Sequence, residues 1–283
     1  MYVIAGVTGH VGSVAAKQLL SSKRKVRVIV RDASKGEPFA KLGAEVAVGT
    51  FEDQAFLSKA LAGAEGAFLL IPPNFAAADF PAYQRKLADT MSAAVKAAAV
   101  PHLVLLSSIG ADLESGLGPI SGLNYLERKL RETGAKLTAL RAGFFQENVA
   151  MSIGPARGQG IYPSFLPASA PVPMNATVDI GREVAKALLN PPSKSEVVDL
   201  VGPAYSTAQI AALLGERLGK ELKVVEIPQE GWLDALVQGG LSPHFASLYV
   251  EMYAGFGKGL ARPVGDRLVQ GTTKIDSVIA GLV

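Results

Sequence analysis

The sequence contains no cysteine and little net charge, and each absence excludes a class of function. Without cysteine, the 283-residue chain can form no disulfide, no thiolate nucleophile and no thiolate metal site. Its three histidines include no pair with metal-ligand spacing, so we expect no metal. The net charge is only +3, and the basic run Lys23 to Lys25 is too short to cover a face. Nucleic-acid binding is therefore not expected.

Long apolar runs are also missing, which argues against a membrane protein. No run approaches the roughly 18 residues that a membrane-spanning helix needs. Met1 to Ala5 pass directly into a strand-like segment without a basic leader. Hydrophobic residues make up 49% of the chain and charged residues 19%, so it can bury a core. These features predict a soluble, cytoplasmic protein with no membrane partner.

Short runs of Val, Ile, Leu and Ala alternate with segments of helical period, a pattern typical of βαβ units around a parallel sheet. The expected strands are Tyr2 to Ala5, Lys25 to Val30, Glu45 to Val48, Gly66 to Ile71, His102 to Leu106, Leu137 to Leu140 and Val197 to Val201. The expected crossover helices are Val11 to Leu20, Asp53 to Leu61 and Phe80 to Ala99. This order predicts an α/β protein with a doubly wound Rossmann sheet over residues 1–150, to which residues 197–201 return as a strand.

The alternation of expected strands and helices ends after Leu140. Residues Ala156 to Pro173 carry several Pro and Gly residues and are expected to form an ordered loop over a site. Helices are expected from a cap at Asp179, from Ser206 to Leu218, near Gly231 to Val237, Pro243 to Gly255 and Thr273 to Leu282. Residues 151–283 are therefore expected to form a smaller, mostly helical, substrate-binding lobe.

The segment Gly6-Val7-Thr8-Gly9-His10-Val11-Gly12 lies between the first expected strand and the first helix. Glycines there permit a tight turn and a close approach of the backbone to a pyrophosphate, which the free N–H groups and dipole of the helix stabilise. The spacing is Gly-x-x-Gly-x-x-Gly, the short-chain dehydrogenase type. A dinucleotide site is therefore expected at Gly6, Thr8, Gly9, His10, Val11 and Gly12.

Cofactor preference is commonly decided at the end of the second strand, which here reads Val30-Arg31-Asp32. An acidic residue at this position would hold the ribose 2′-hydroxyl of NAD, whereas a guanidinium grips the 2′-phosphate of NADP. We place Arg31 at the deciding position, so NADP(H) is favoured. Asp32 is the competitor, and a surface Arg31–Asp32 pair is the structural alternative.

Several segments together resemble the NmrA-like branch of the atypical short-chain dehydrogenases. They are Gly6 to Gly12, Arg31, Leu105 to Ser108, Leu130 to Gly134, Leu140 to Asn148 and Ser206 to Pro228. That branch includes NAD(P)H-dependent quinone, azo-dye and triphenylmethane-dye reductases as well as non-catalytic redox sensors. The resemblance implies a Rossmann fold and covers nearly the whole chain.

The proton-donating pair of the wider superfamily, Tyr-x-x-x-Lys, is matched in letters by Tyr125 and Lys129. Aligning the helix that follows puts the lysine position at Leu123 and the tyrosine position at Pro119. At about 100° per residue, Leu123, Leu126 and Leu130 share a buried stripe from which Tyr125 and Lys129 are displaced. They are weak catalytic candidates, and no other residue is assigned a catalytic role.

By resemblance, most of the remaining site residues lie at the carboxyl ends of strands. Further cofactor contacts would be Thr50, Phe51, Ile71, Pro72, Ser107, Ser108 and Gly143. Substrate contacts would be Phe75, Ile109, Phe144, Phe145, Asn148, Tyr162 and Trp232. The aromatic members could stack on an acceptor or belong to the core.

Without a fixed acid, carbonyl chemistry is disfavoured, as are the epimerases and isoflavone-type reductases that need one. Quinones and conjugated dyes accept hydride into a delocalised system, so orientation can supply most of the catalysis. We therefore expect an NADPH-dependent reductase of a small quinone-like, azo-dye-like or triphenylmethane-dye-like aromatic acceptor, without flavin, as a monomer or homodimer. The alternative is a non-catalytic NADP(H)-binding redox sensor of the NmrA type.

Overall fold

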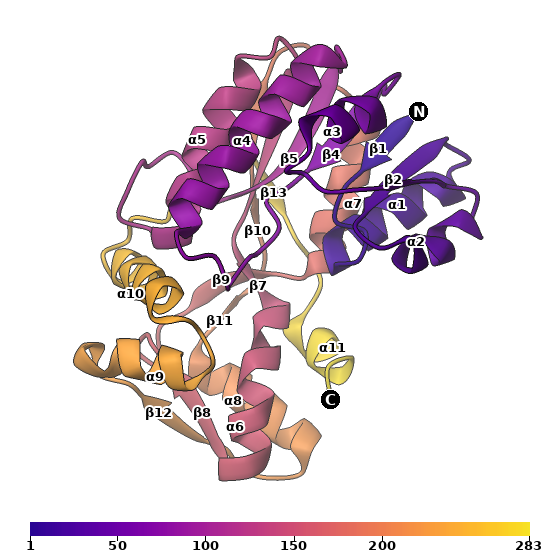
Figure 1. Cartoon of the computed structure of the whole chain (residues 1–283). Coiled ribbons are helices and arrows are strands. Elements are labelled where there is room, and N and C mark those ends of the chain that lie inside the picture. Colours follow the sequence, from indigo (N-terminus) through magenta and orange to yellow (C-terminus); the bar gives the residue numbers. More distant parts are fainter.

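The structure, a computed structural model, describes all 283 residues and is built on one large sheet. Eight parallel strands follow the order β13-β10-β6-β5-β4-β1-β2-β3 (Figure 1). Their bounds are β1 Tyr2–Ile4, β2 Val26–Val30, β3 Glu45–Val48, β4 Gly66–Leu69, β5 His102–Ser108, β6 Lys136–Ala142, β10 Glu196–Val201 and β13 Arg267–Gln270. The chain thus forms the expected α/β doubly wound sheet, including the return strand.

Helices cover both faces of this sheet because successive strand residues point to opposite sides. On one face Leu103 and Leu105 of β5 pack with α3 (Gln54–Leu61), α4 (Phe80–Ala97) and α5 (Ser121–Arg131). On the other face Val104 lies in a second core with α1 (His10–Ser21), α2 (Ala33–Ala40) and α7 (Thr177–Leu189). The sheet is therefore sandwiched, and its carboxyl edge stays free for a site.

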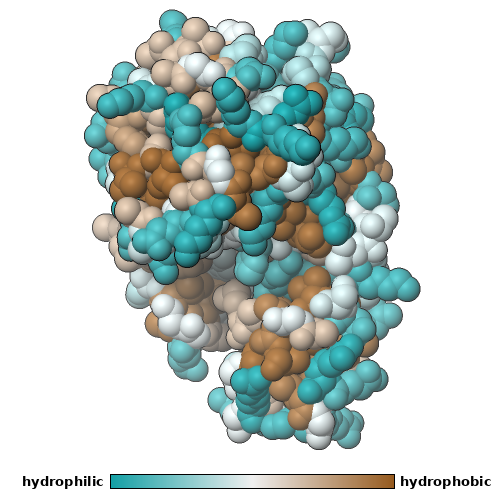
Figure 2. Space-filling model, turned by 90° about the vertical axis from the view of Figure 1, so that its right-hand side faces the viewer, coloured by the Kyte–Doolittle hydropathy of each residue, from teal (hydrophilic) through white to brown (hydrophobic).

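A smaller lobe lies below that edge in Figure 1, and Figure 2 shows a recess between the two parts on one face. The smaller lobe contains two short sheets, β12-β8 and β11-β9-β7, with helices around them. Their bounds are β7 Phe144–Phe145, β8 Ile161–Ser164, β9 Val172–Asn175, β11 Ala204–Tyr205, β12 Lys223–Glu226, α6 Ala150–Gln159, α8 Thr207–Leu218, α9 Trp232–Gln238, α10 Pro243–Gly257 and α11 Ile275–Ala280. A separate core, with Tyr162 and Leu214, stabilises this lobe.

Several expectations after residue 150 were wrong in detail. Residues 156–173 are not one loop, because α6 continues to Gln159 and β8 follows after Gly160, which ends the helix at a φ of 68°. Asp179 is not a helix cap: α7 begins at Thr177, and Asp179 in its first turn instead binds Thr272 and Thr273. The elements that were not predicted include α2, α6, the short strands β7, β8, β9 and β11, and β13.

The division at residue 150 stays a prediction. Three elements of the second segment, α7, β10 and β13, pack into the large sheet and its core. No helix is both long enough and apolar enough to cross a membrane.

Candidate active site at the carboxyl edge

The glycine loop after β1 has the shape that a phosphate-binding turn requires. Gly6 has a φ of 63°, a left-handed conformation that favours glycine. A Cβ on Gly12 would lie 2.5 Å from the carbonyl oxygens of Ala5 and Gly6. Gly9 caps α1 and donates its N–H to the carbonyl of Gly6 at 3.0 Å, whereas the N–H groups of His10, Val11 and Gly12 have no acceptor in the protein. They form an anion-binding helix start.

A groove of about 520 Å³ lies beside this loop. Thr8 and His10 are exposed on one side of it, and Ser277 and Val278 of α11 lie on the other. Its floor includes the amino end of α7, where Glu147 accepts hydrogen bonds from the Thr177 N–H and hydroxyl. These hydrogen bonds hold the Glu147 carboxylate against the start of α7, where the helix dipole favours a negative group.

Arg31 directly follows β2 and is exposed, with no ion pair to Asp32. Asp32 instead caps α2, where its carboxylate accepts the Ser34 N–H at 2.9 Å. That hydrogen bond lowers the pKa of Asp32. The competitor for the ribose is therefore committed to a helix cap, and the guanidinium is left to meet a ligand.

Other expected cofactor residues lie at the ends of neighbouring strands. Thr50 is exposed after β3, and Phe51 packs partly into the core next to it. Ile71 and Pro72 follow β4 and are half-buried. Gly143 follows β6, and a Cβ there would lie 3.2 Å from the Asn175 side chain. Because parallel strands end on the same edge, these residues lie along one edge of the sheet.

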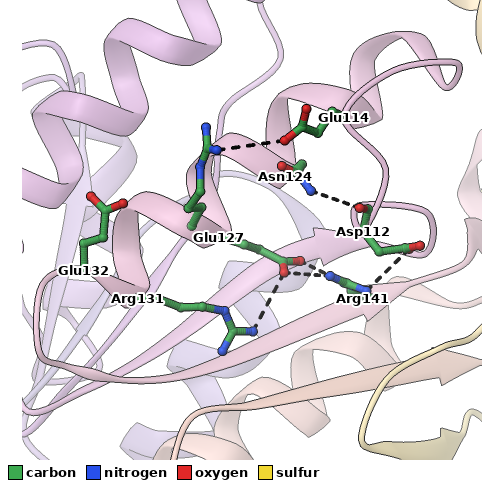
Figure 3. A pocket seen from close by; sticks show the side chains of 8 residues that line it. Asp112, Glu114, Asn124, Glu127, Arg131, Glu132 and Arg141 are labelled. Atoms are coloured by element: carbon green, nitrogen blue, oxygen red, sulfur yellow. Dashed lines mark hydrogen bonds and ion pairs between the residues drawn. The ribbon is translucent and has the colours of Figure 1, made fainter.

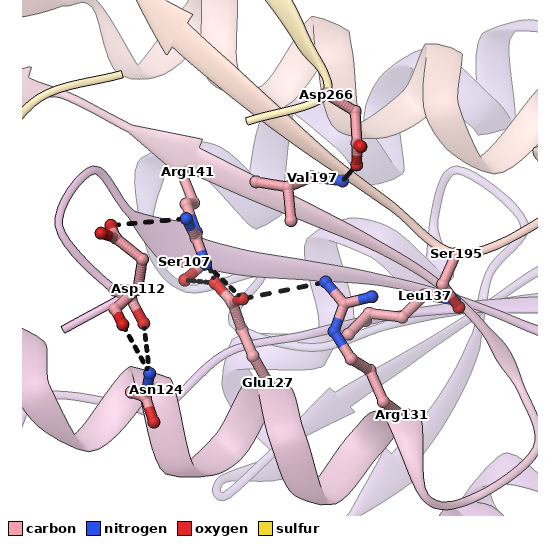
Figure 4. Close-up of polar contacts among 11 residues, drawn as sticks. Ser107, Asp112, Asn124, Glu127, Arg131, Leu137, Arg141, Ser195, Val197 and Asp266 are labelled. Carbon is pink, nitrogen blue, oxygen red and sulfur yellow. Dashed lines mark hydrogen bonds and ion pairs between the residues drawn. The ribbon is translucent and has the colours of Figure 1, made fainter. Parts of the chain in front are cut away.

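Ser107 and Ser108 at the end of β5 point to opposite faces of the sheet. Ser108 bonds the carbonyl of Ile109, whereas the buried Ser107 hydroxyl donates to Glu127 of α5 at 2.6 Å (Figure 4). Glu127 also holds Arg141 of β6 through two hydrogen bonds of 2.9 and 2.8 Å. Only 5% of the Glu127 side chain and 8% of the Arg141 side chain are exposed, so this is a buried, bidentate ion pair.

The pair borders a hollow of about 550 Å³ that is lined entirely by charged and amide side chains (Figure 3). There Asp112 lies 3.5 Å from Arg141, while Asn124 donates to the carbonyls of Ala111 and Asp112 at 3.0 and 3.1 Å. These contacts connect the segment after β5 to α5 and β6. The sequence did not predict this network. The available signal was Glu127, a charged residue within the apolar stripe of its helix.

The expected substrate residues divide between the site and the cores. Tyr162 belongs to the core of the smaller lobe, and Phe145 packs against the core of the large sheet. Ile109 is buried directly after β5 and Asn148 is half-buried in the turn after β7. Phe75 is 48% exposed after β4.

Phe144 and Trp232 join a larger group of aromatic rings. Phe144 lies 6.3 Å from Phe256, and Trp232 lies 6.1 Å from Tyr253, both measured between ring centroids. Phe256 and Tyr253 belong to α10, a helix that the sequence predicted without assigning it any part of the site. A four-residue spacing of aromatics was the available signal.

The model of the NmrA-like family matches residues 2–262. The chain belongs to the NmrA-like family. It is 27% identical to the NAD(P)H azoreductase of Xenophilus azovorans, over 90% of this chain and 86% of that protein. It is 26% identical to quinone oxidoreductase 2 of Escherichia coli K12, over 92% and 89%. The triphenylmethane reductase of Citrobacter sp., solved with NADP(H), superposes with a TM-score of 0.83 at 20% identity, over 100% and 99%.

In this NmrA-like protein, Tyr125 and Lys129 of α5 both contact α4. The Tyr125 hydroxyl donates to Asp89 of α4 at 2.8 Å, and Lys129 lies 3.5 Å from the same carboxylate. The hydrogen bond to Asp89 raises the pKa of Tyr125, the opposite of what a proton donor beside a lysine needs. Their weak candidacy receives no support from this geometry.

Proposed function

We propose that this NmrA-like protein is an NADPH-dependent reductase that transfers hydride to a quinone-like aromatic acceptor without a flavin. The glycine loop and the free Arg31 support the cofactor, and the similarity to reductases over most of the chain supports the activity. The observation that carries the proposal is the glycine loop. Its tight turn has no room for a Cβ at Gly12, so the backbone itself is exposed to a dinucleotide phosphate.

The residues that we propose to hold NADPH lie in the glycine loop and at the ends of the strands. The helix start at His10, Val11 and Gly12 would bind the pyrophosphate, and Arg31 would bind the 2′-phosphate. Thr50, Phe51, Ile71, Pro72, Ser107, Ser108 and Gly143 would border the remainder. When bound, NADPH supplies the hydride.

An aromatic acceptor suits this site because rings gather beside the strand ends. Phe75, Phe144 and Trp232 lie in one chain of ring contacts that runs through α10. Stacking on such rings orients a flat molecule. Orientation against the nicotinamide is the main requirement for hydride transfer into a delocalised acceptor. Azo and triphenylmethane dyes are further candidates, because they too are aromatic and conjugated.

Arg31→Ala tests both the cofactor and the activity. Loss of charge-assisted bonds to the 2′-phosphate is expected to raise the Kd and KM for NADPH by roughly tenfold to a hundredfold. NADH lacks that phosphate, so its constants should stay unchanged, which makes it the internal control. The measurement is cofactor titration together with quinone-dependent oxidation of each cofactor.

Two results would contradict parts of the proposal, and a third would show that the variant is misfolded. Unchanged NADPH affinity in Arg31→Ala would remove the assignment of Arg31. Equal losses for NADPH and NADH would point to a folding defect. Tight NADPH binding by the wild type without oxidation by any acceptor would favour the redox sensor, which needs no catalytic tyrosine.

A further inference from the structure

Helix α10 presents a row of aromatic side chains on one face. Phe245, Tyr249, Tyr253 and Phe256, here called the aromatic row, are spaced by four, four and three residues, which keeps them on one side of a helix. Their successive ring centroids are 5.4, 6.1 and 6.3 Å apart. The row is therefore continuous along the helix.

The aromatic row spans the ends of three central strands. At its start, Phe245 contacts Phe75 and Phe80 after β4, with ring centroids 5.0 and 4.8 Å apart. In its middle, α10 packs on the segment after β5, where Glu251 accepts the Gly116 N–H at 2.7 Å. At its end, Phe256 meets Phe144, which follows β6. The row thus lies where an open α/β sheet binds its ligands.

The start of α10 is also fixed in place. The His244 ring accepts the Phe80 N–H at 3.1 Å and so connects α10 to the first residue of α4. A Cβ on Gly118 would collide with the Leu248 carbonyl, which shows how closely the helix lies on the segment after β5. These contacts place the aromatic row against the segments that follow β4 and β5.

Two hydroxyl groups of the row have no partner in the protein. Tyr249 and Tyr253 are half-buried, and burial raises the pKa of each, so both phenols stay neutral hydrogen-bond donors. The two hydroxyl oxygens are not among the fully buried polar atoms that lack a hydrogen-bond partner. Both hydroxyls are therefore accessible to solvent. By contrast, the nearby Trp232 donates its indole N–H to Ile227 at 2.7 Å. Unused donors among otherwise apolar rings indicate a ligand oxygen.

We propose that Tyr249 and Tyr253 donate hydrogen bonds to the oxygens of a quinone bound along the aromatic row. This inference rests on the proposed reductase function. Hydride addition from NADPH brings two electrons to the quinone and leaves negative charge on oxygen, and a proton from water completes the hydroquinone. Phenol donors aimed at that oxygen stabilise the charge as it develops. Quinones are therefore preferred over acceptors that carry no oxygen.

The Tyr249→Phe/Tyr253→Phe double variant removes both hydroxyls and keeps both rings. We expect kcat/KM for menadione to fall roughly tenfold or more. Reduction of crystal violet, which has no oxygen, should stay within about twofold, as should NADPH affinity. Tyr2→Phe is the matched control and should behave as wild type. Tyr2 is the first residue of β1 and so lies at the amino ends of the strands, away from the site at their carboxyl ends.

Binding provides a readout that does not depend on turnover. Trp232 is the single tryptophan, and its ring lies 6.1 Å from that of Tyr253, so its fluorescence should report menadione at the row. Weaker menadione binding in the double variant supports the inference even if no hydride is transferred, which would refute only the reductase. Unchanged menadione binding and turnover in the double variant would overturn the inference and leave the reductase standing. Absence of menadione binding to the wild type would overturn the inference as well.

Discussion

The Glu127→Ala variant is expected to unfold at a temperature roughly 6–20 °C below that of the wild type. Glu127 is the only partner of the Ser107 hydroxyl and holds Arg141 with two hydrogen bonds. Removing it leaves the buried guanidinium with only Asp112, 3.5 Å away. Breaking a buried ion pair costs about 3–5 kcal/mol, and each kcal/mol shifts the melting temperature of a domain this size by roughly 2–4 °C.

Thermal unfolding followed by circular dichroism measures this loss, and Glu132→Ala, at the carboxyl-terminal cap of α5, is the control. Glu132 is exposed and lies 3.6 Å from Lys129, a surface pair worth at most about 1 kcal/mol. Equal melting temperatures for the two variants would show that the buried network contributes no special stability. A Glu127→Ala/Arg141→Met double variant should regain part of the loss, because no unpaired charge remains buried.

Gly12→Ala is expected to weaken NADPH binding by at least about tenfold and to lower the melting temperature as well. The added methyl group would meet the carbonyl oxygens of Ala5 and Gly6 at 2.5 Å. Backbone atoms cannot move aside as a flexible side chain can, so α1 must shift away from β1 at a cost of about 1–3 kcal/mol or more. Such a shift misplaces the N–H groups that would bind the pyrophosphate.

Gly9→Ala separates these two effects. A Cβ at Gly9 would find only the Gly6 carbonyl oxygen, at an ordinary 3.5 Å, and its φ of −98° suits alanine. Its melting temperature should match the wild type, so any loss of NADPH affinity reports contact with the ligand alone. Cofactor titration and thermal unfolding of both variants make the comparison. Wild-type behaviour of Gly12→Ala in both assays would refute the tight fit of this loop.

The sheet could be predicted because its strands are apolar runs separated by segments of helical period. Helix α2 could not be predicted because it is short, contains Pro38 and buries only Gly36 and Phe39. Strand β13 reads Arg-Leu-Val-Gln and lies at the sheet edge, so it has no apolar run to reveal it. The periodicity of apolar residues in a sequence reflects which side chains are buried. Elements that bury few side chains therefore have no clear pattern in the sequence.

The candidate site could be predicted only where local sequence dictates local shape. The glycine loop is such a case, because strand, turn and helix are adjacent in the chain. The Glu127–Arg141 pair and the aromatic row depend on how α5 and α10 pack against the strand ends. The aromatic spacing in α10 is visible in the sequence, but its position across β4, β5 and β6 comes from tertiary contacts.

The most direct test of the reductase mixes flavin-free wild-type protein, loaded with NADPH, with one equivalent of menadione and follows reduced nicotinamide. Repeating the reaction with NADPH deuterated at the transferred position identifies the hydride step. The account predicts single-turnover oxidation that slows with deuterium and yields hydroquinone without added flavin. Unchanged absorbance of tightly bound NADPH, with menadione and with dyes alike, would contradict it and identify a sensor.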